Sequence, residues 1–344
     1  MLEAVLLFIA ASLFTIFAAM KLAKFGDAIA ETTELGHSLV GLILLSAATS
    51  LPELFSSSSA AFIGNIDLSF GNVFGSNMTN IFILVIMDIL VRERPILFGV
   101  SQNNIMTGGI VIFITALVLL MIYIAHLAKF ASFDFWFLSV ILFIFYVGGM
   151  VLIYFYEKGQ LKNIETEHKT TDIIEGEKMT KAKAIVGFLI ASVFVFFAAI
   201  LLSYSSDLID QRSNLGGTFI GTLFMAFTTS LPEVVVSIAA LRLGSHDMAL
   251  GNLFGSNLFN LAILSFSDGF HRLGAFFRSQ PIPDDAFTLA DPNHIISGLI
   301  GLIFVGIVLS SLMLRQKKKK GPLGMDTLTI GTLYILGMFL LYIL

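Results

Sequence analysis

The chain has 344 residues, of which 56% are hydrophobic and only 13% charged, and its mean hydropathy is +0.91. Soluble domains average about 25% charged residues, so the composition excludes an ordinary soluble protein and predicts an integral membrane protein. The formal net charge of −4 gives no reason to expect a nucleic-acid partner. Because the sequence has no cysteine, disulfides, zinc–thiolate sites and iron–sulfur clusters are also excluded.

Apolar stretches of about 20 residues recur along the chain, and each is long enough to cross the ~30 Å hydrocarbon core of a bilayer. The first stretch carries Glu3 and lacks the basic start of a signal peptide, so we interpret it as a retained span. The pattern predicts an all-α polytopic membrane protein with ten transmembrane helices, at 3–21, 37–62, 68–90, 104–126, 134–156, 184–205, 216–241, 247–267, 295–314 and 325–344.

A polar stretch at 157–183 separates two predicted five-helix domains, 1–156 and 184–344. Shifting the sequence by 180 positions aligns 4–80 with 184–260 without a gap, and 17 of the 40 residues in 41–80 are identical to their partners. The chain therefore contains an internal repeat. Because five is an odd number, the second repeat enters the membrane from the opposite side, and inverted repeats of this kind are typical of secondary transporters.

Loop charge predicts the orientation of the spans. Of the 20 Lys and Arg residues, 16 lie in the odd-numbered loops and four in the even-numbered ones. The positive-inside rule places the odd-numbered loops in the cytoplasm. We therefore expect both termini outside and the linker 157–183 in the cytoplasm. The compact size and the absence of an organelle-targeting segment favour a multi-pass protein of a prokaryotic plasma (inner) membrane.

The pentapeptide Thr-Ser-Leu-Pro-Glu occurs at 49–53 and again at 229–233, each time inside an apolar stretch. Pro52 and Pro232 predict helix breaks, because proline removes a backbone hydrogen bond and clashes with the preceding turn. Glu53 and Glu233 fall near the middle of their spans, where a charge costs at least ~2.5 kcal/mol. A structural kink would need the proline but not the acid, so the repeated glutamate indicates a functional site.

Polar side chains recur at helical spacing around both glutamates and in the following spans. Together they predict a pocket of carboxylate, hydroxyl, amide and carbonyl oxygens, which suits hard cations such as Ca²⁺ and Na⁺. The stripes consist of Ser46, Ser50, Glu53 and Ser57, then Asn72, Ser76 and Asn80, and in the second half Ala226, Ser230, Glu233 and Ser237, then Asn252, Ser256 and Asn260.

Other matched residues favour structural roles. Glycine pairs with G-x-x-x-G spacing at 71/75 and 251/255 predict close helix packing. The pairs Asp88/Arg92 and Asp268/Arg272 are spaced i, i+4 near span ends and predict surface salt bridges, with a role in an ion vestibule as the alternative. The matched Asp27 and Asp207 predict contacts at helix ends or in loops, with a role in the ion site as the alternative.

The repeats TSLPELFSSSSAAFIGNIDLSFGNVFGSNMTN and TSLPEVVVSIAALRLGSHDMALGNLFGSNLFN resemble those of the cation/calcium exchanger superfamily, and its prokaryotic sodium/calcium exchanger branch in particular. The resemblance implies that spans one and six slide to switch access. It also implies ion-binding roles: Ca²⁺ carboxylates at Glu53 and Glu233, backbone carbonyls at Thr49 and Thr229, Na⁺ ligands at Ser50, Ser76, Ser230 and Ser256, and central amides at Asn80 and Asn260.

The resulting expectation is exchange of Ca²⁺ for Na⁺ by alternating access, with the transported ions and the lipid bilayer as partners and no resident cofactor. Some relatives carry aspartate where this chain has Asn260, so stoichiometry and potassium dependence stay open. A proton/calcium antiporter is the main alternative, and a channel is another. An intramembrane enzyme is disfavoured, because the sequence has no His-Glu-x-x-His motif and no Ser–His arrangement near the acids.

Overall fold

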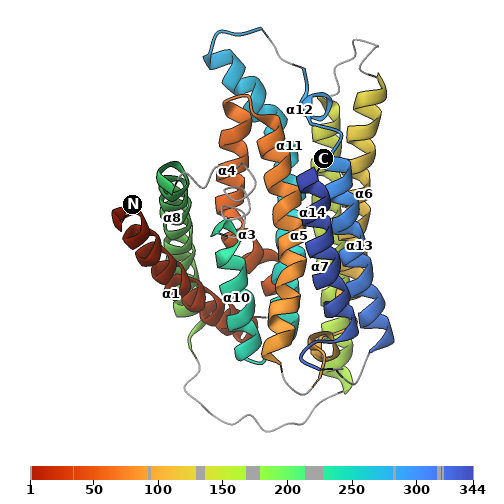
Figure 1. Ribbon diagram of the computed structural model, residues 1–344. Coiled ribbons are helices and arrows are strands. Elements are labelled where there is room, and N and C mark those ends of the chain that lie inside the picture. The colour runs from red at the N-terminus through yellow and green to blue at the C-terminus, as the bar shows by residue number, and fades with distance from the viewer. Residues whose placement is uncertain are drawn as a thin grey trace. The chain divides into compact units, whose positions relative to one another are not determined.

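The computed structural model describes residues 2–33, 35–91, 94–128, 136–167, 179–213, 228–281, 284–315, 319 and 321–343, and within these ranges it contains helices and no strand (Figure 1). The helices form two compact units. Unit 1 consists of Met1–Thr49, Gly99–Thr107 and Gly149–Gly255, and unit 2 of Ser50–Phe98, Gly108–Gly148 and Ser256–Leu344. Each unit thus contains segments from both sequence halves.

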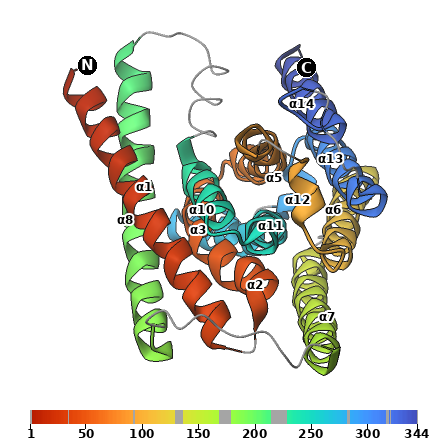
Figure 2. The same cartoon turned by 90° about the horizontal axis from the view of Figure 1, so that it is seen from below.

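In unit 1, the long helices α1 (Leu2–Thr32) and α8 (Lys181–Ser213) lie side by side (Figures 1 and 2). Phe14 and Phe194, which correspond at the 180-residue offset, meet edge to face with ring centroids 5.7 Å apart. Small side chains let such helices approach closely. Buried alanines recur every seven residues in both helices, at Ala4, Ala11 and Ala18 in α1 and at Ala184, Ala191 and Ala198 in α8.

The remaining helices of unit 1 are short or shared with unit 2. They are α2 (Gly36–Leu39), the π-helical turn η1 (Val40–Leu45), α3 (Ser46–Thr49), α10 (Leu231–Arg242), the end of α7 (Phe137–Glu167) and the start of α11 (His246–Phe277).

Glycines allow the segment α2–η1–α3 to approach α11 closely, as the second G-x-x-x-G pair predicts. A Cβ added at Gly251 would lie 2.6 Å from the Ser38 carbonyl oxygen, and one at Gly255 would lie 2.6 Å from the Ser46 hydroxyl. In the first pair, an added Cβ at Gly75 would meet no described atom within 4 Å. The segment that corresponds to η1 at the 180-residue offset, 220–225, lies outside the described residues.

Unit 2 is built around α5 (Ile66–Leu90), which is hydrogen-bonded to α11 and packs against four further helices. These are α4 (Leu51–Phe62), α12 (Ala286–Leu289), α13 (His294–Leu314) and α14 (Met325–Ile343). Most of the 3₁₀ turn η2 (Ile96–Gly99) and of α6 (Asn104–Ala128), the start of α7 and the greater part of α11 complete the unit. Figure 1 shows α5, α13 and α14 as long neighbouring helices.

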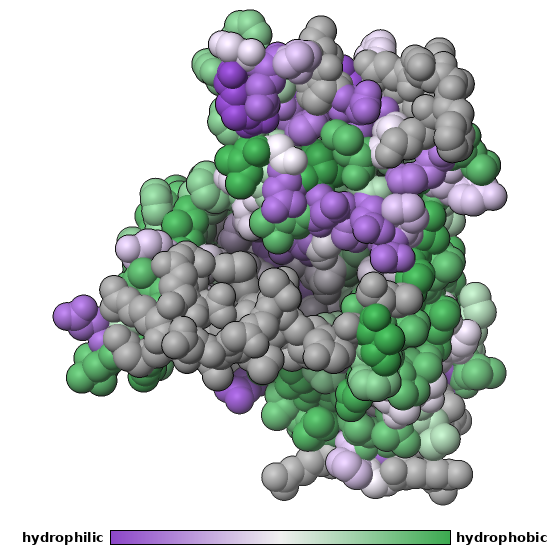
Figure 3. All heavy atoms as spheres, turned by 45° about the horizontal axis from the view of Figure 1, so that its top comes forward, coloured by the Kyte–Doolittle hydropathy of each residue, from purple (hydrophilic) through white to green (hydrophobic). Residues whose placement is uncertain are grey.

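Seven described helices are long and apolar enough to cross a membrane, and the broken segment Gly36–Phe62 raises the number to eight if it counts as one span. The apolar part of α14, Met325–Leu341, is shorter. The predicted seventh span, 216–241, includes residues outside the described ranges, so the total of ten stays a prediction. In Figure 3 hydrophobic residues form wide green areas on the helix surfaces, while hydrophilic residues in purple gather towards the top of the view.

Four helices, α1, α7, α8 and α11, extend by eight residues or more beyond the ends of their predicted spans. Helix α1 was expected to end near residue 21 but continues to Thr32, and α7 continues to Glu167, inside the predicted linker. Hydropathy marks the part of a helix that suits lipid, whereas a helix ends where the backbone is interrupted. After α1 the next helix, α2, begins at Gly36, whose φ of +71° departs from helical geometry.

Candidate ion-binding site

The two Thr-Ser-Leu-Pro-Glu motifs break their helices in the same way. Helix α3 ends at Thr49 and α4 begins at Leu51, with Ser50 at φ −91° and ψ 5°. Ser230, just before α10, has φ −82° and ψ 4°. The prolines occupy the first turn of α4 and α10, where an amide donor is not needed. The predicted helix breaks are therefore confirmed at both motifs.

Each break places a glutamate at the start of a helix. Glu53 lies in the first turn of α4 in unit 2, and Glu233 lies in the first turn of α10 in unit 1. Both side chains are 1% exposed. The positive end of the helix dipole favours a carboxylate at this position, but burial of a charge remains costly unless another charge compensates it. Each site is thus suited to a cation.

An asparagine from the next helix binds a serine one turn beyond each glutamate. In unit 2 the Asn72 Nδ2 donates to Ser57 Oγ at 2.8 Å, and in unit 1 the Asn252 Nδ2 donates to Ser237 Oγ at 3.1 Å. Both ends of the two bonds correspond at the 180-residue offset. The bonds fix the helix that carries each glutamate against the helix that follows it.

Four amides in unit 2 form a symmetric network between α5 and α11. Asn80 Nδ2 donates to Asn257 Oδ1 at 3.0 Å, and Asn260 Nδ2 donates to Asn77 Oδ1 at 3.1 Å. The inner pair is reciprocal, because the Nδ2 atoms of Asn77 and Asn257 each donate to the other residue's backbone carbonyl at 3.3 Å. Exchanging the two repeats leaves the pattern of bonds unchanged.

The network also determines which amide atom each asparagine presents. A backbone carbonyl can only accept a hydrogen bond, so Asn77 and Asn257 must use Nδ2 towards it and offer Oδ1 to the outer amides. Asn80 and Asn260 must therefore turn their Nδ2 atoms inward. Their Oδ1 atoms are left as buried acceptors without a hydrogen-bond partner among the described residues.

Two serine hydroxyls, like the outer amide oxygens, are buried without a hydrogen-bond partner among the described residues. They are the Oγ atoms of Ser76 in unit 2 and Ser230 in unit 1. A buried polar atom left in this state costs about 1–3 kcal/mol. Hydroxyl and amide oxygens are ligands that Na⁺ and Ca²⁺ accept, so each unit offers ligands of the predicted type.

The hydroxyl of Thr49 is engaged within unit 1. It lies 3.4 Å from Asn252 Oδ1 and 3.3 Å from the Ser46 carbonyl oxygen. The side chain of Thr49 therefore holds the helix break together, which leaves its backbone as the part predicted to bind an ion.

All ten predicted site residues are buried, with exposures of 3% or less. The predicted pocket draws on residues of both units and stays a prediction, and Ala226 lies outside the described residues. Unit 1 contains Thr49, Thr229, Ser230 and Glu233, and unit 2 contains Ser50, Glu53, Ser76, Asn80, Ser256 and Asn260.

The sequence interpretation missed Asn77 and Asn257. Both belong to the repeated segment Gly-Ser-Asn-x-x-Asn and precede Asn80 and Asn260 by three residues. Their identity at the 180-residue offset was a usable signal. A spacing of three also places each pair on one side of a helix, which would have suggested that the amides act together.

The prediction of a surface salt bridge at Asp88 is wrong. Asp88 is fully buried, and its carboxylate pairs with Lys319 at 2.9 Å and accepts bonds from Ile96 N at 2.7 Å and Gly324 N at 2.6 Å. The predicted partner, Arg92, lies outside the described residues. Spacing within one helix could not reveal partners that come from distant loops.

The second copy of this pair does form. Arg272 Nε lies 3.2 Å from Asp268 Oδ2, as the i, i+4 spacing predicts, although Asp268 is only 4% exposed and so is not at the surface. The predicted loop contact of Asp27 is also present, because its Oδ1 lies 3.2 Å from His37 Nε2 and accepts a bond from Ser245 Oγ at 2.8 Å. The side chain of Asp207 lies outside the described residues.

Apolar helices of membrane length, with two similar breaks that each carry a buried acid, define a membrane transporter of cations. The model of the family described as sodium/calcium exchanger protein matches residues 3–155 and 183–344. The chain belongs to this family, which lies within the cation/calcium exchanger superfamily. It is therefore a multi-pass integral membrane protein and a cation/Ca²⁺ antiporter.

Individual relatives agree with this assignment. The inner membrane protein YrbG of Escherichia coli is 26% identical over 271 residues, which cover 77% of this chain and 78% of YrbG. The sodium/calcium exchanger MaX1 of Methanosarcina acetivorans is 30% identical over 124 residues, covering 36% of this chain and 34% of MaX1. The fold is shared with the sodium–calcium exchanger NCX_Mj, solved in crystals soaked with Na⁺ and Ca²⁺, at a TM-score of 0.64 and 20% identity over 98% of both chains.

Proposed function

We propose that the chain exchanges Na⁺ for Ca²⁺ by alternating access. In this proposal the carboxylates of Glu53 and Glu233 balance the charge of one Ca²⁺ ion, with help from the backbone carbonyls of Thr49 and Thr229. Na⁺ binds to neutral oxygens, and both ions are cargo rather than resident cofactors. The neutral ligands are the hydroxyls of Ser50, Ser76, Ser230 and Ser256 and the amides of Asn80 and Asn260.

The observation that supports this proposal most directly is the orientation of the amides. The inner asparagines require Asn80 and Asn260 to present oxygen, not nitrogen, as the atom without a partner. A bound cation attracts an amide oxygen and repels an amide NH₂ group. The network thus pre-organises two ligands of the correct polarity, and pre-organisation lowers the entropic cost of binding.

The choice of Na⁺ over a proton rests on the neutral ligands. A proton would need only the two carboxylates, and the surrounding hydroxyls would have no part in its binding. Na⁺ has a radius close to that of Ca²⁺ but half its charge, so several ions must replace one Ca²⁺ and additional sites are required. The buried hydroxyls of Ser76 and Ser230 are suitable ligands for them.

The test is ⁴⁵Ca²⁺ uptake into proteoliposomes that contain either Na⁺ or choline, with the pH gradient collapsed by a protonophore. We expect uptake only with internal Na⁺. Ser230→Ala should weaken the dependence on internal Na⁺. Ser192→Ala is the matched control, because the Ser192 hydroxyl donates to the Phe188 carbonyl within α8 at 2.9 Å and should not affect transport.

A different result would identify the alternative coupling ion. Uptake that ignores internal Na⁺ but follows an imposed pH gradient would establish a proton/calcium antiporter and contradict the proposal. Uptake that needs neither gradient would indicate a channel. In both cases Ser230→Ala and Ser192→Ala should behave alike.

A further inference from the structure

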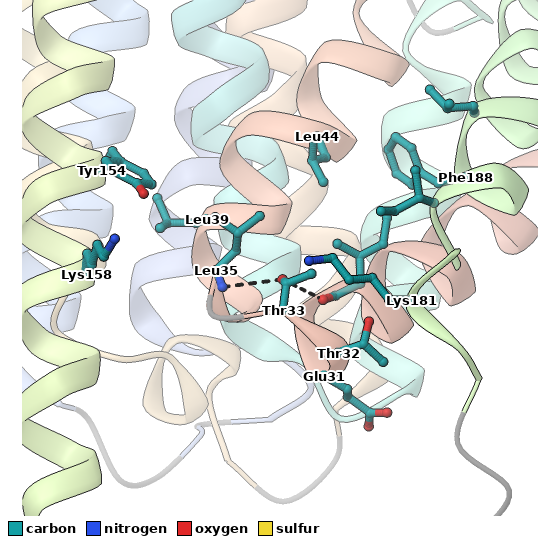
Figure 4. Close-up of a pocket in the computed structure, with 13 residues that line it drawn as sticks. Glu31, Thr32, Thr33, Leu35, Leu39, Leu44, Tyr154, Lys158, Lys181 and Phe188 are labelled. Atoms are coloured by element: carbon teal, nitrogen blue, oxygen red, sulfur yellow. Dashed lines mark hydrogen bonds between the residues drawn. The ribbon is translucent and has the colours of Figure 1, made fainter. Parts of the chain in front are cut away.

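Unit 1 contains a pocket of about 780 Å³ that is separate from the predicted ion ligands (Figure 4). Helices α1, α2, α7 and α8 and the turn η1 all contribute to its wall. Its volume is in the range typical of small-molecule sites. Thirteen residues line it: Ile29, Glu31, Thr32, Thr33, Leu35, Leu39, Leu44, Tyr154, Lys158, Lys181, Ile185, Phe188 and Leu189.

The pocket has an apolar wall and a polar end. Seven aliphatic or aromatic hydrocarbon side chains form the wall, and in α8 these include Ile185 and Leu189, which remain exposed at 38% and 59%. In a membrane-spanning helix such exposed side chains face acyl chains. The polar end contains two lysines, one glutamate, two threonines and the ring of Tyr154. An occupant should therefore have a hydrocarbon part and a polar head.

The charges at the polar end favour an anionic head. Lys158 extends from α7 and Lys181 from α8, and Figure 4 shows their ammonium groups on opposite sides of the pocket, directed towards its interior. Within the described residues, neither ammonium group has a carboxylate within 4.0 Å. Glu31 supplies the one negative charge of the lining, so the two lysines leave the polar end with a net positive charge.

The two threonine hydroxyls at this end already donate hydrogen bonds to backbone carbonyls of α1. Thr32 donates to the Ala28 carbonyl at 2.6 Å and Thr33 donates to the Ile29 carbonyl at 2.7 Å. The donors available to a ligand are thus the two lysines and the Tyr154 hydroxyl. Two separated cationic donors suit a phosphate group, which carries negative charge on several oxygens.

We propose that this pocket binds an anionic phospholipid, with its phosphate between Lys158 and Lys181 and an acyl chain along the apolar wall. The loop charges predict that this end of α7 and α8 faces the cytoplasm, and anionic lipids attract basic groups between helices on that side. A bilayer lipid satisfies both parts of the lining, whereas a free phosphate would leave the apolar wall without a partner.

A lipid in this position would contact helices with different expected roles. Helices α1 and α8 correspond to the spans that the family resemblance expects to slide, and α7 does not. A lipid held by both Lys158 and Lys181 would link α7 to α8. Occupancy should therefore alter the rate of exchange, and this part of the inference rests on the proposed function, whereas the binding itself does not.

The test compares lipid binding by the purified full-length protein in detergent, using native mass spectrometry with phosphatidylglycerol or phosphatidylcholine. The wild type should retain phosphatidylglycerol preferentially, and Lys158→Gln/Lys181→Gln should weaken its binding about tenfold. The matched control is Lys24→Gln/Lys183→Gln, which removes the same charge from exposed lysines of α1 and α8 outside the pocket. It should keep the preference.

Additional measurements separate the two parts of the ligand. Leu44→Trp fills the apolar wall without changing charge and should also reduce phosphatidylglycerol binding, after gel filtration has shown that the variant is folded. Inorganic phosphate should raise the thermal stability much less than phosphatidylglycerol does.

Three results would overturn the proposal: equal binding of the two lipids, equal loss in the pocket and control variants, or a full stabilising effect of inorganic phosphate alone. None of these measurements depends on Ca²⁺ transport, so a failure here is distinguishable from a failure of the exchange proposal.

Discussion

The first repeat from Ser50 to Asp88 and the second from Ser230 to Asp268 agree at the level of single bonds. At the two helix breaks, φ is −91° at Ser50 and −82° at Ser230, a difference of 9°. The next turns each contain a glycine with positive φ, +93° at Gly64 and +83° at Gly244. The asparagine–serine bonds and the amide network also recur in matched form.

The repeats diverge at their last matched acid. Asp88 accepts a backbone bond from Ile96, eight residues on, and Asp268 accepts the equivalent bond from Ala286, eighteen residues on. Asp88 also binds Lys319 and the Gly324 amide, far along the chain, whereas the cation beside Asp268 is Arg272 of the same helix.

The comparison separates two kinds of constraint. The asparagine–serine bonds beside the glutamates and the four-asparagine network have kept the same partners in both repeats, as the proposed equal contribution of the two halves would require. Asp88 and Asp268 have kept one bond, to the segment that follows their helix, and have acquired different cations. A loop can be anchored to a helix in several ways, whereas the hydrogen bonds beside the two glutamates and in the amide network have been preserved in detail.

The largest expected effect concerns the glutamates. Glu53→Gln and Glu233→Gln should each abolish Ca²⁺ uptake, because one carboxylate cannot balance a divalent ion in a site of low dielectric, where Coulomb energies reach several kcal/mol. The measurement is initial ⁴⁵Ca²⁺ uptake by proteoliposomes containing equal amounts of folded protein.

Glu157→Gln is the matched control for these variants. Glu157 is also buried, at 4% exposure, and binds Ser38 Oγ at 3.0 Å outside the repeated motifs. It should retain uptake. Substantial uptake by either motif variant would break the comparison, because the two glutamates would then not be equivalent.

Much of this site was accessible from the sequence because it repeats. The 180-residue offset identified both glutamates, both prolines and the serine and asparagine stripes, and the hydropathy pattern identified most membrane helices. The inference needed only local rules: proline breaks a helix, and residues spaced three or four apart share a face.

The remainder depended on tertiary contacts that no local rule contains. The partners of Asp88 come from a loop more than 230 residues away, so spacing suggested Arg92 instead. The end of α1 was placed too early because its last turns contain charged residues that still support a helix. The amide orientation follows from backbone carbonyls of another helix and could not be deduced from residue type.

The second expected effect is on stability and should differ between the repeats. Asp88→Asn replaces an acceptor oxygen with a donor in a buried site and leaves Lys319, whose side chain is 5% exposed, without its counter-charge. Breaking such a pair costs about 3–5 kcal/mol. Asp268→Asn should cost less, about 1–2 kcal/mol, because Arg272 is 25% exposed and can be solvated.

Thermal unfolding in detergent, followed by intrinsic fluorescence, measures this difference. The double variant Asp88→Asn/Lys319→Met is the control, since it removes both charges and should recover part of the stability lost by Asp88→Asn. Equal losses for the two aspartates would mean that their different cations have no energetic consequence.

A third and smaller effect tests the symmetry of the amide network. Asn77→Ala and Asn257→Ala each remove the acceptor that orients one outer amide, Asn260 or Asn80 respectively. The released amide can rotate, so the apparent affinity for Ca²⁺ should fall about tenfold, equivalent to ~1.4 kcal/mol, and by similar factors in both variants.

The Ca²⁺ dependence of the initial uptake rate measures this change. Thr79→Val, in α5 like Asn77, is the control, because within the described residues the Thr79 hydroxyl bonds only the Gly75 carbonyl, at 3.0 Å, and Tyr334, at 3.3 Å. It should leave the Ca²⁺ affinity unchanged. A tenfold effect in one asparagine variant alone would show that the network is symmetric in geometry but not in function.

The smallest expected effect concerns the glycines that end α4 and α10. At both ends the residue after the glycine donates to a carbonyl five residues back, Asn65 N to Ala60 O at 2.9 Å and Ser245 N to Ala240 O at 3.0 Å, the bond of a glycine-terminated helix cap. A Cβ added at Gly64 would lie 3.5 Å from Arg278 Nη2, which is ordinary van der Waals contact. A Cβ added at Gly244 would meet no described atom within 4 Å. Gly64→Ala and Gly244→Ala should therefore lower the thermal stability through backbone strain alone, by about 1 kcal/mol each.

The control is Gly109→Ala, inside α6, where an added Cβ would meet no described atom within 4 Å. This variant should raise the thermal stability, because alanine favours a helix over glycine. Unequal losses at the two caps would show that the repeats differ in a feature where their backbones coincide.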